Sequence, residues 1–337
     1  QTARGLGDNI TYALGSFISA FLQIVFNILF LVVFKLGVVG MLSATVIAQL
    51  IAAIFIFVKK KLYSYIEFKL YDKNLLKEIF RYSFPLIPNA LCWWALNASD
   101  RTIVMVFLGT ASNGLLSVGH KFSSIYITVY NIFNLSWTES AALHMNDEDR
   151  DEFFSGVIEN MFKFFMCVGI GLISIMSLVF KYFVHSNFYS AYGLVPFFVL
   201  ASMFNVVVGL YSVIYVALKK TGEIAKTSIY SGIINIVMHL VLIKFIGLYA
   251  APISSAIAFA IMAVYRYIDL KKYVNVRLNI KYILLFICLY ILAIGIYFGK
   301  YTIIKIVFLI SIAILSLMLN WKIIGGFIHA FVEKIHR

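Results

Sequence analysis

Long uncharged runs of apolar residues recur along this 337-residue chain. The runs at 10–34, 36–58, 245–265 and 282–299 have the length, roughly 17–25 residues, with which an α-helix crosses a lipid bilayer. They lack the alternation of a β-strand, so the pattern predicts an all-α polytopic membrane protein and not a β-barrel. About ten transmembrane helices are expected, at 10–34, 37–58, 80–108, 111–143, 153–180, 192–218, 225–245, 249–270, 282–298 and 303–321.

The composition agrees with this pattern, and the distribution of charge adds a topology. Apolar residues make up 62% of the chain, charged residues 13%, and the mean hydropathy is +0.94. On the predicted helices, 20 of the 28 Lys and Arg residues, including Arg4 and Arg266, fall on one side and five on the other. This bias follows the positive-inside rule, so the Arg4 side is cytoplasmic. The net charge of +13 therefore reflects topology and does not indicate nucleic-acid binding.

The sequence carries no pattern typical of an enzyme or a metal site. Cys92, Cys167 and Cys288 lie singly on three different predicted helices, which argues against disulfides and zinc. No two His residues have the HxxxH spacing, and no predicted outer loop is longer than about a dozen residues. We therefore expect neither catalytic residues nor a bound metal.

Two predicted helices, 80–108 and 111–143, carry polar side chains that are costly in lipid. A charge at the bilayer centre costs about 3 kcal/mol on insertion scales, so such residues normally face protein or water. On each helix the polar positions recur at helical spacing and share one face. They are Asn89, Trp93, Asn97, Asp100 and Arg101 on the first helix, and Lys121, Ser124, Thr128 and Asn131 on the second.

The depths of the charged residues in the membrane suggest a role for this pair of helices. Residues 109–114 have the composition of a turn. At a rise of about 1.5 Å per residue, Asp100 lies roughly 14 Å from this turn and Lys121 roughly 10 Å from it. Similar depth on adjacent antiparallel helices favours a hydrated substrate cavity lined by both polar faces. The alternative is a buried ion pair between Asp100 and Lys121 that only orders the helices.

Lys163, within 153–180, and His239, within 225–245, are two further cavity candidates. Lys163 can instead extend its charge toward the membrane surface. A His in this setting is more often satisfied by neighbouring helices than it is a ligand. Trp93, Trp94 and Trp137 suit stacking on sugars, and packing or anchoring at the membrane surface explains them equally well.

An internal repeat relates 4–61 to 220–272. Each segment opens with a basic residue, a Gly and an acid, continues through a helix with a midspan polar residue, and ends in paired lysines. Four predicted helices precede the second copy. The repeat therefore predicts two similar six-helix lobes, with about four N-terminal helices of the full protein outside this chain. The expected organisation is 1–61, the last two helices of the N-terminal lobe; 62–79, a cytoplasmic interfacial linker; 80–272, the C-terminal lobe; 281–321, two additional helices; and 322–337, a cytoplasmic tail.

Several motifs point to a known family: Phe-Pro-Leu-Ile-Pro-Asn at 84–89, Trp-Trp at 93–94, Asn-Ala-Ser-Asp-Arg at 97–101 and the stretch 108–121. In these motifs and in residues 1–7, the chain resembles the bacterial polysaccharide (O-antigen, Wzx-type) flippases. These belong to the multidrug/oligosaccharidyl-lipid/polysaccharide exporter superfamily. The resemblance implies a multi-pass protein of the bacterial inner membrane with two lobes around a central cavity. It also implies transport of an undecaprenyl-pyrophosphate-linked oligosaccharide to the outer leaflet. Membrane lipids, a polysaccharide polymerase and chain-length proteins are the other partners it suggests.

Within this resemblance, Arg101 and Lys121 suit the pyrophosphate or acidic sugars, because both are cationic and Arg can bind bidentately. Asp100 either holds Lys121 in place or takes part in ion coupling. No cofactor is expected, and the sequence leaves open whether protons or sodium ions drive transport. Two other classes remain: a drug or ion antiporter of the same superfamily, and a membrane polysaccharide polymerase or ligase, which would need a large outer loop.

Overall fold

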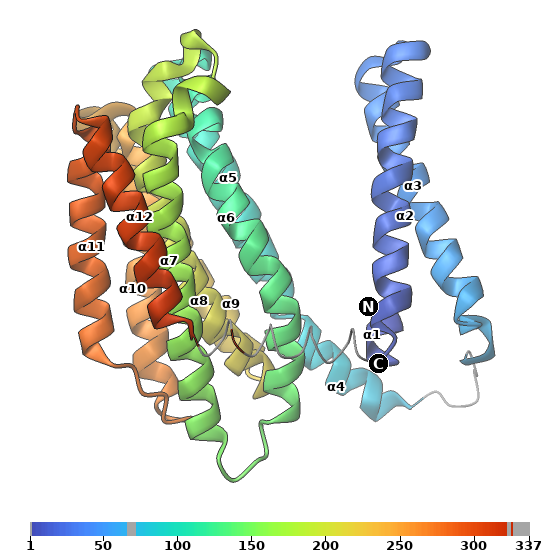
Figure 1. Ribbon diagram of the computed structural model, residues 1–337. Helices are drawn as coiled ribbons and strands as arrows, with labels where there is room; N and C mark the ends of the chain where they lie inside the picture. Colours follow the sequence, from blue (N-terminus) through green and yellow to red (C-terminus); the bar gives the residue numbers. More distant parts are fainter. Residues whose placement is uncertain (1, 66–71, 322–324, 326–337) are drawn as a thin grey trace. The chain divides into compact units, whose positions relative to one another are not determined.

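The computed structural model describes residues 2–65, 72–321 and 325, except for the side chain of Asn97. All regular secondary structure in these residues is helical, and the chain divides into two compact units, Gln1–Lys77 and Glu78–Arg337 (Figure 1). Seven described segments are long and apolar enough to cross a membrane, and one of them, Thr221–Leu270, contains two helices. The prediction of an all-α polytopic membrane protein is thus confirmed. The predicted tail, 322–337, and residues 66–71 of the predicted linker lie almost entirely outside the described residues.

The first unit is a helical hairpin. Helix α2 (Asn9–Asn27), extended by the π-helical turn η1 (Ile28–Val33), packs against α3 (Gly37–Lys59). The short helices α1 (Thr2–Gly5) and η2 (Leu62–Tyr65) flank them. Small residues let two helix backbones approach closely within a membrane. They occupy every fourth position along the buried face of α3, at Gly40, Ala44, Ala48 and Ala52.

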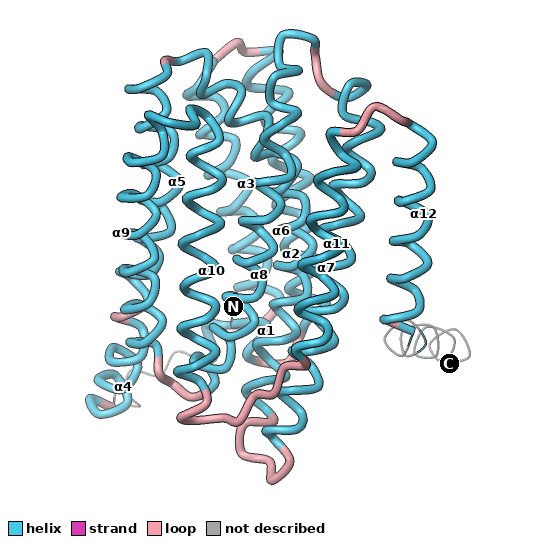
Figure 2. The backbone as a smooth tube through the Cα atoms, turned by 90° about the vertical axis from the view of Figure 1, so that its left-hand side faces the viewer, coloured by secondary structure: helices cyan, strands magenta, loops and turns pink. Residues whose placement is uncertain are grey.

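The second unit begins within α4 (Lys73–Ser83), an amphipathic helix with no buried residue. Eight long helices follow, joined by loops at their two ends (Figure 2). They are α5 (Leu86–Leu108), α6 (Thr110–Leu143), α7 (Arg150–Phe183), α8 (Val195–Ala217), α9 (Thr221–Ile246), α10 (Ala250–Leu270), α11 (Ile280–Phe298) and α12 (Thr302–Leu319), with the 3-10 helices η4 (Ser186–Leu194) and η5 (Gly247–Tyr249).

Helix α8 is the most buried helix of this unit and organises the others. It packs against α6, α7 and α10, while α5 packs against α9, and α9 against α10. Helices α11 and α12 both pack on α7. The core that results joins α6, α7, α8, α10 and α11 and leaves the polar face of α5 next to α9 and α6.

Two helix boundaries differ from the sequence-based expectation. The helix predicted from Phe80 is interrupted at Pro85, since α4 ends at Ser83 and α5 begins at Leu86. A proline has no N–H, and its ring clashes with the carbonyl four residues earlier, so one helix does not continue through this point. The turn predicted at 109–114 contracts to Gly109, whose φ of 83° is accessible to glycine, and α6 begins at once.

Candidate functional site

The single-residue turn at Gly109 sets which side chains of α5 and α6 lie at the same depth. Asp100 lies nine positions before Gly109 and Lys121 twelve positions after it, so at about 1.5 Å per residue they differ by roughly one helical turn. Ser117 and His120 are the polar residues of α6 closest in depth to Asp100 and Arg101. With the shorter turn, Lys121 lies deeper than Asp100 by about one helical turn, whereas the sequence places it shallower by a similar distance.

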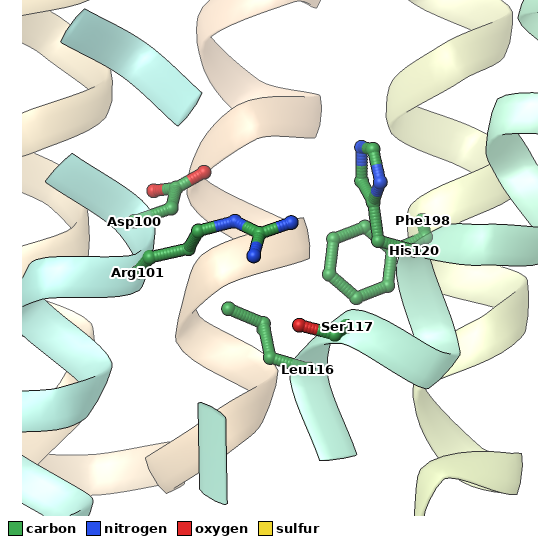
Figure 3. Close-up of a pocket in the computed structure, with 6 residues that line it drawn as sticks. All are labelled: Asp100, Arg101, Leu116, Ser117, His120 and Phe198. Carbon is green, nitrogen blue, oxygen red and sulfur yellow. The ribbon is translucent and has the colours of Figure 1, made fainter. Parts of the chain in front are cut away.

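A pocket opens at this level of the second unit (Figure 3). Its empty volume is about 300 Å³, part of it open to the surface. Arg101 extends toward the α6 side chains in Figure 3, and none of the described ion pairs involves its guanidinium. The lining residues are Asp100 and Arg101 from α5, Leu116, Ser117 and His120 from α6, and Phe198 from α8.

Close packing of α6 on α8 fixes one wall of the pocket. The ring of His120 meets Phe198 edge to face at a centroid distance of 5.4 Å. One residue earlier, a Cβ added at Gly119 would lie 3.1 Å from the Leu194 Cβ and 3.3 Å from the Phe198 ring. This tight approach holds His120 at the pocket rim, beside Arg101.

The Asp100 carboxylate bonds to α9 and α10 and not to Lys121. His239 Nδ1 lies 2.7 Å from Asp100 Oδ1, and the Ser255 hydroxyl donates to Asp100 Oδ2 at 3.4 Å. Asn235, one turn before His239, donates to Ser255 Oγ at 2.9 Å and to Ser254 Oγ at 3.4 Å. The side chain of His239 is 0% exposed and that of Asp100 18% exposed. Asp100 therefore does not pair with Lys121, as one alternative predicted. It belongs to a polar cluster that joins α5, α9 and α10.

A second buried polar cluster surrounds Arg266, four residues before the end of α10. The Arg266 side chain is buried, and its Nε and Nη2 donate to Thr227 Oγ1 at 3.0 and 2.7 Å. Its other contacts are equally neutral: the carbonyls of Val208 and Ile224, at 3.2 and 3.3 Å, the hydroxyl of Ser212, and the hydroxyl of Ser228 at 3.4 Å. In the described part of the chain, no carboxylate forms an ion pair with Arg266.

The charge bias places Arg266 on the cytoplasmic side, and the structure adds that its side chain is buried among helices and does not face the loop. The sequence does indicate this burial, because Arg266 lies inside the predicted helix 249–270 and not in a loop. The hydroxyls that surround it come from α8 and α9, however, and the sequence alone does not bring those helices together. The cluster extends to the predicted cavity residue Asn89, whose Oδ1 accepts from the Ser228 hydroxyl at 2.6 Å.

The remaining predicted cavity residues differ in what their side chains contact. Trp93 packs on Phe259 of α10 with ring centroids 5.3 Å apart. The hydroxyls of Ser124 and Thr128 donate to carbonyls of their own helix, at 2.7 and 2.8 Å. Lys121 and Asn131 are exposed on α6, so they stay available to a ligand. The side chain of Asn97 lies outside the described part of the structure.

Lys163 lies at the interface between α7 and α11, apart from the pocket. Its Nζ is 3.3 Å from Glu159 Oε1 and 4.8 Å from the centre of the Tyr282 ring. Because the Lys163 side chain is largely buried in these contacts, we interpret it as a packing residue. Trp137 is also a packing residue, because its ring is buried and its Nε1 donates to the Leu210 carbonyl at 3.2 Å.

No protein-family model and no curated protein sequence matches the chain. Solved structures do match. A MATE transporter in complex with MaL6 has a TM-score of 0.67 and 15% identity over 79% of this chain and 63% of its own. The lipid II flippase MurJ in an inward closed conformation has a TM-score of 0.62 and 19% identity over 95% of this chain and 70% of its own. The fold is that of the MATE and MurJ exporters.

This exporter fold also matches a Vibrio cholerae MATE transporter in a bent form, with a TM-score of 0.60 and 13% identity over 88% of this chain and 66% of that one. The chain thus spans less than two thirds of the length of these MATE transporters. The arrangement of helices that frames the pocket is therefore shared with multi-pass transporters.

Proposed function

We propose that this chain is part of a flippase that moves an undecaprenyl-pyrophosphate-linked oligosaccharide across the bacterial inner membrane for O-antigen, capsule or exopolysaccharide synthesis. Its two lobes, with 80–272 as the C-terminal one, would open a cavity to each leaflet in turn. The observation that carries the proposal is the exposed guanidinium of Arg101 at an open pocket in an exporter fold. The motif resemblance to polysaccharide flippases and the structural likeness to MurJ support it.

The chemistry of the pocket suits an anionic, hydroxyl-rich substrate. Pyrophosphate cannot cross hydrocarbon unaided, and the planar guanidinium of Arg101 can bind two of its oxygens at once. His120 at the same rim adds a further donor, and Lys121 and Asn131 line the exposed face of α6. Sugar hydroxyls would find amide partners at Asn131 and, on α5, at Asn89 and Asn97. A polysaccharide polymerase and chain-length proteins would then act on the product outside.

A drug antiporter is the second candidate, because several of the matching structures are MATE transporters, one of them of a multidrug resistance MATE family. The Arg101 guanidinium distinguishes the two functions, because the other charged group of the pocket, Asp100, is already bonded to His239 and Ser255. A cationic drug would approach the positive Arg101 guanidinium, which is unfavourable, whereas a pyrophosphate would be attracted. A drug-efflux assay on the same strain separates them directly.

The test replaces Arg101 and Lys121 in the intact protein and measures surface polysaccharide in cells that lack the native copy. Arg101→Ala should abolish or strongly reduce the polysaccharide, and Arg101→Lys should restore part of it, because charge remains without the bidentate geometry. Lys181→Ala, at the exposed end of α7, is the matched control and should leave the polysaccharide unchanged. Normal polysaccharide in an Arg101→Ala, Lys121→Ala double variant would contradict the proposal.

A further inference from the structure

A groove lies between α9 and α10 and shares no lining residue with the pocket at Arg101. Its empty volume is about 430 Å³, part of it open to the surface, which falls in the range of ligand pockets, about 300–1,000 Å³. Buried side chains form its floor, and more exposed ones form its rim. The floor includes Thr227, Ser231 and Ala258, and the rim includes Tyr230, Ile261 and Tyr265.

The hydroxyl groups on the floor of the groove already have partners. The Ser231 hydroxyl donates to the Ala258 carbonyl at 3.3 Å. The Thr227 hydroxyl donates to the Glu223 carbonyl at 2.8 Å and accepts from Arg266 Nη2 at 2.7 Å. A sugar or an ion placed here would leave its own polar groups without partners, which is unfavourable. The floor of the groove therefore suits an apolar chain.

The position of the groove along α9 indicates what can fill it. The segment Thr221–Leu270, which contains both helices, is long and apolar enough to cross a membrane. Exposed side chains beside the groove include Ile233, Val264 and Ile268. At about 1.5 Å per residue, the groove residues 227–234 extend from roughly 9 to 20 Å beyond the start of α9. The charge bias places this end of α9 in the cytoplasm, so the groove faces the acyl chains of the cytoplasmic leaflet.

A lysine lies at the cytoplasmic end of the groove. Lys226 precedes Tyr230 of the rim by four residues, so the two share one face of α9. The Lys226 side chain is exposed, and its Nζ lies 4.0 Å from Glu223 Oε2, a long distance for an ion pair. Asp269 of α10, by contrast, is bonded to Lys272 at 2.7 Å. Lys226 is therefore a loosely held cation that a lipid phosphate can reach.

Arg266 gives the same end of the groove a charge that the described acids do not balance. The two lysines at this end are each paired with an acid. The buried guanidinium of Arg266 forms no ion pair with a described carboxylate, and it bonds to Thr227 on the floor of the groove. A buried charge without a counter-charge is costly, and an anion close to it lowers that cost. A lipid with a net negative charge supplies such an anion, whereas a zwitterionic lipid brings a cation with it.

We propose that the groove between α9 and α10 binds one acyl chain of an anionic phospholipid of the cytoplasmic leaflet, with the lipid phosphate at Lys226. Arg266 attracts the phosphate through the floor of the groove. Tyr230 and Tyr265 at the rim suit the boundary between acyl chains and headgroups, where tyrosines are enriched in membrane proteins. The site does not depend on the proposed transport function, because neither the pocket at Arg101 nor the substrate takes part in it.

The first experiment tests the headgroup by native mass spectrometry of the intact protein in detergent, mixed with equal amounts of phosphatidylglycerol and phosphatidylethanolamine that carry the same acyl chains. One phosphatidylglycerol should stay bound with a preference of about fivefold, the effect of one lysine near a charged headgroup. Lys226→Gln should remove most of this preference. Lys244→Gln, exposed at the opposite end of α9, is the matched control and should leave it unchanged. Equal retention of both lipids by the wild type would overturn the proposal.

The second experiment tests the groove itself in the same assay. Ser231→Leu fills the floor and should abolish the retained phosphatidylglycerol. Ser231→Ala loses the same hydroxyl bond to Ala258 but leaves the groove open, so it is the control and should bind as the wild type does. Ile261→Phe guards against a Leu variant that does not fold, because it narrows the groove from the exposed rim and should also weaken retention. Unchanged retention in Ile261→Phe and in a folded Ser231→Leu would contradict the proposal.

A competition in the same assay separates the phospholipid from other occupants of the groove. Undecaprenyl phosphate at equal concentration should leave the bound phosphatidylglycerol in place. Its displacement of the phospholipid from the wild type would assign the groove to an isoprenoid chain and overturn the proposal. A lipid-free dimer of the wild type that Ser231→Leu converts to a monomer would assign the groove to a second copy of the chain, which would equally overturn it.

Discussion

Single residues of this chain show how far hydropathy alone predicts their environment. Arg266 looks like one more cytoplasmic cation in the sequence, yet its side chain is buried and bonded to hydroxyls and carbonyls of α8 and α9. Asp100 and His239 were both expected in a cavity, but their contact was not, since it joins residues 139 positions apart. Polarity on a helix face is thus readable from sequence, whereas the partner of a polar group depends on tertiary packing.

Arg266 should be a major determinant of stability in the second unit. Arg266→Ala removes the hydrogen bonds of a buried guanidinium and leaves a cavity between α8, α9 and α10, and a hydrogen bond to a charged group contributes about 1.5–3 kcal/mol. We expect a loss of about 3 kcal/mol in unfolding free energy, measured by denaturant titration in detergent micelles. Arg277→Ala, an exposed arginine in the following loop, is the control and should change stability by less than about 0.5 kcal/mol. Equal stability of both variants would refute this role.

Asp8 should make the start of α2 sensitive to acid. It caps α2 by accepting from the Thr11 amide at 2.8 Å and the Thr11 hydroxyl at 2.7 Å, and it pairs with Lys60. The hydrogen bond from Lys60, followed by that from the Thr11 amide, holds the pKa of Asp8 well below its ordinary value of 3.8.

Because the folded state lowers the pKa of Asp8, the carboxylate stabilises the cap above about pH 4 and this contribution is lost as the pH falls further. The protection of the first turn of α2 against hydrogen exchange, relative to the intrinsic rate at each pH, should therefore fall below about pH 4 in the wild type. In Asp8→Asn the protection of this turn should be lower at neutral pH and independent of pH in the same range. An identical acid response in the variant would show that another group is responsible.

At the scale of elements, the sequence predicts the helices well and their ends less well. The long apolar runs mark α2, α3 and α7 to α12 without ambiguity. Helices α5 and α6 are less obvious, since their polar side chains lower the mean hydropathy and neither is among the seven apolar segments. The position of a turn follows from one backbone angle at Gly109, and several glycines and asparagines nearby compete for that role in the sequence.

The turn at Gly109 sets the register of α5 against α6 and therefore the composition of the pocket. Its φ of 83° lies in the left-handed region, which costs a residue with a Cβ about 1–2 kcal/mol. Gly109→Val should lower the thermal stability of the protein and reduce transport, because relief of the strain shifts α6 past α5. Gly295→Val, at an exposed helical position of α11 with open space around an added Cβ, is the control. The prediction is wrong if both variants melt at the same temperature.

At the scale of the whole molecule, the fold class was predictable and the function was not. The length and number of apolar runs suffice for a polytopic helical protein, and solved exporters share its arrangement of helices. The proposed substrate, by contrast, is inferred from a few side chains around Asp100 and Arg101. Their grouping arises from contacts between α5, α6 and α9, which no single stretch of sequence contains.

The predicted topology can be tested on the intact protein in cells. The charge bias places the α6–α7 loop in the cytoplasm and the far end of α7 outside. In a variant with Cys92, Cys167 and Cys288 replaced by Ser, a cysteine at the exposed Tyr182 should react with a membrane-impermeant maleimide added to intact cells. A cysteine at the exposed Glu148 should react only after the cells are opened. If the labelling pattern is the reverse, the predicted orientation of every helix is wrong.

The row of small residues along α3 has a mechanical consequence. With Gly40, Ala44, Ala48 and Ala52 buried along one face, that face of α3 carries little side-chain volume to rearrange when its neighbour moves. In the proposed transport cycle, α2 and α3 would therefore tilt together as one stiff pair, and bending would be confined to the ends of the hairpin.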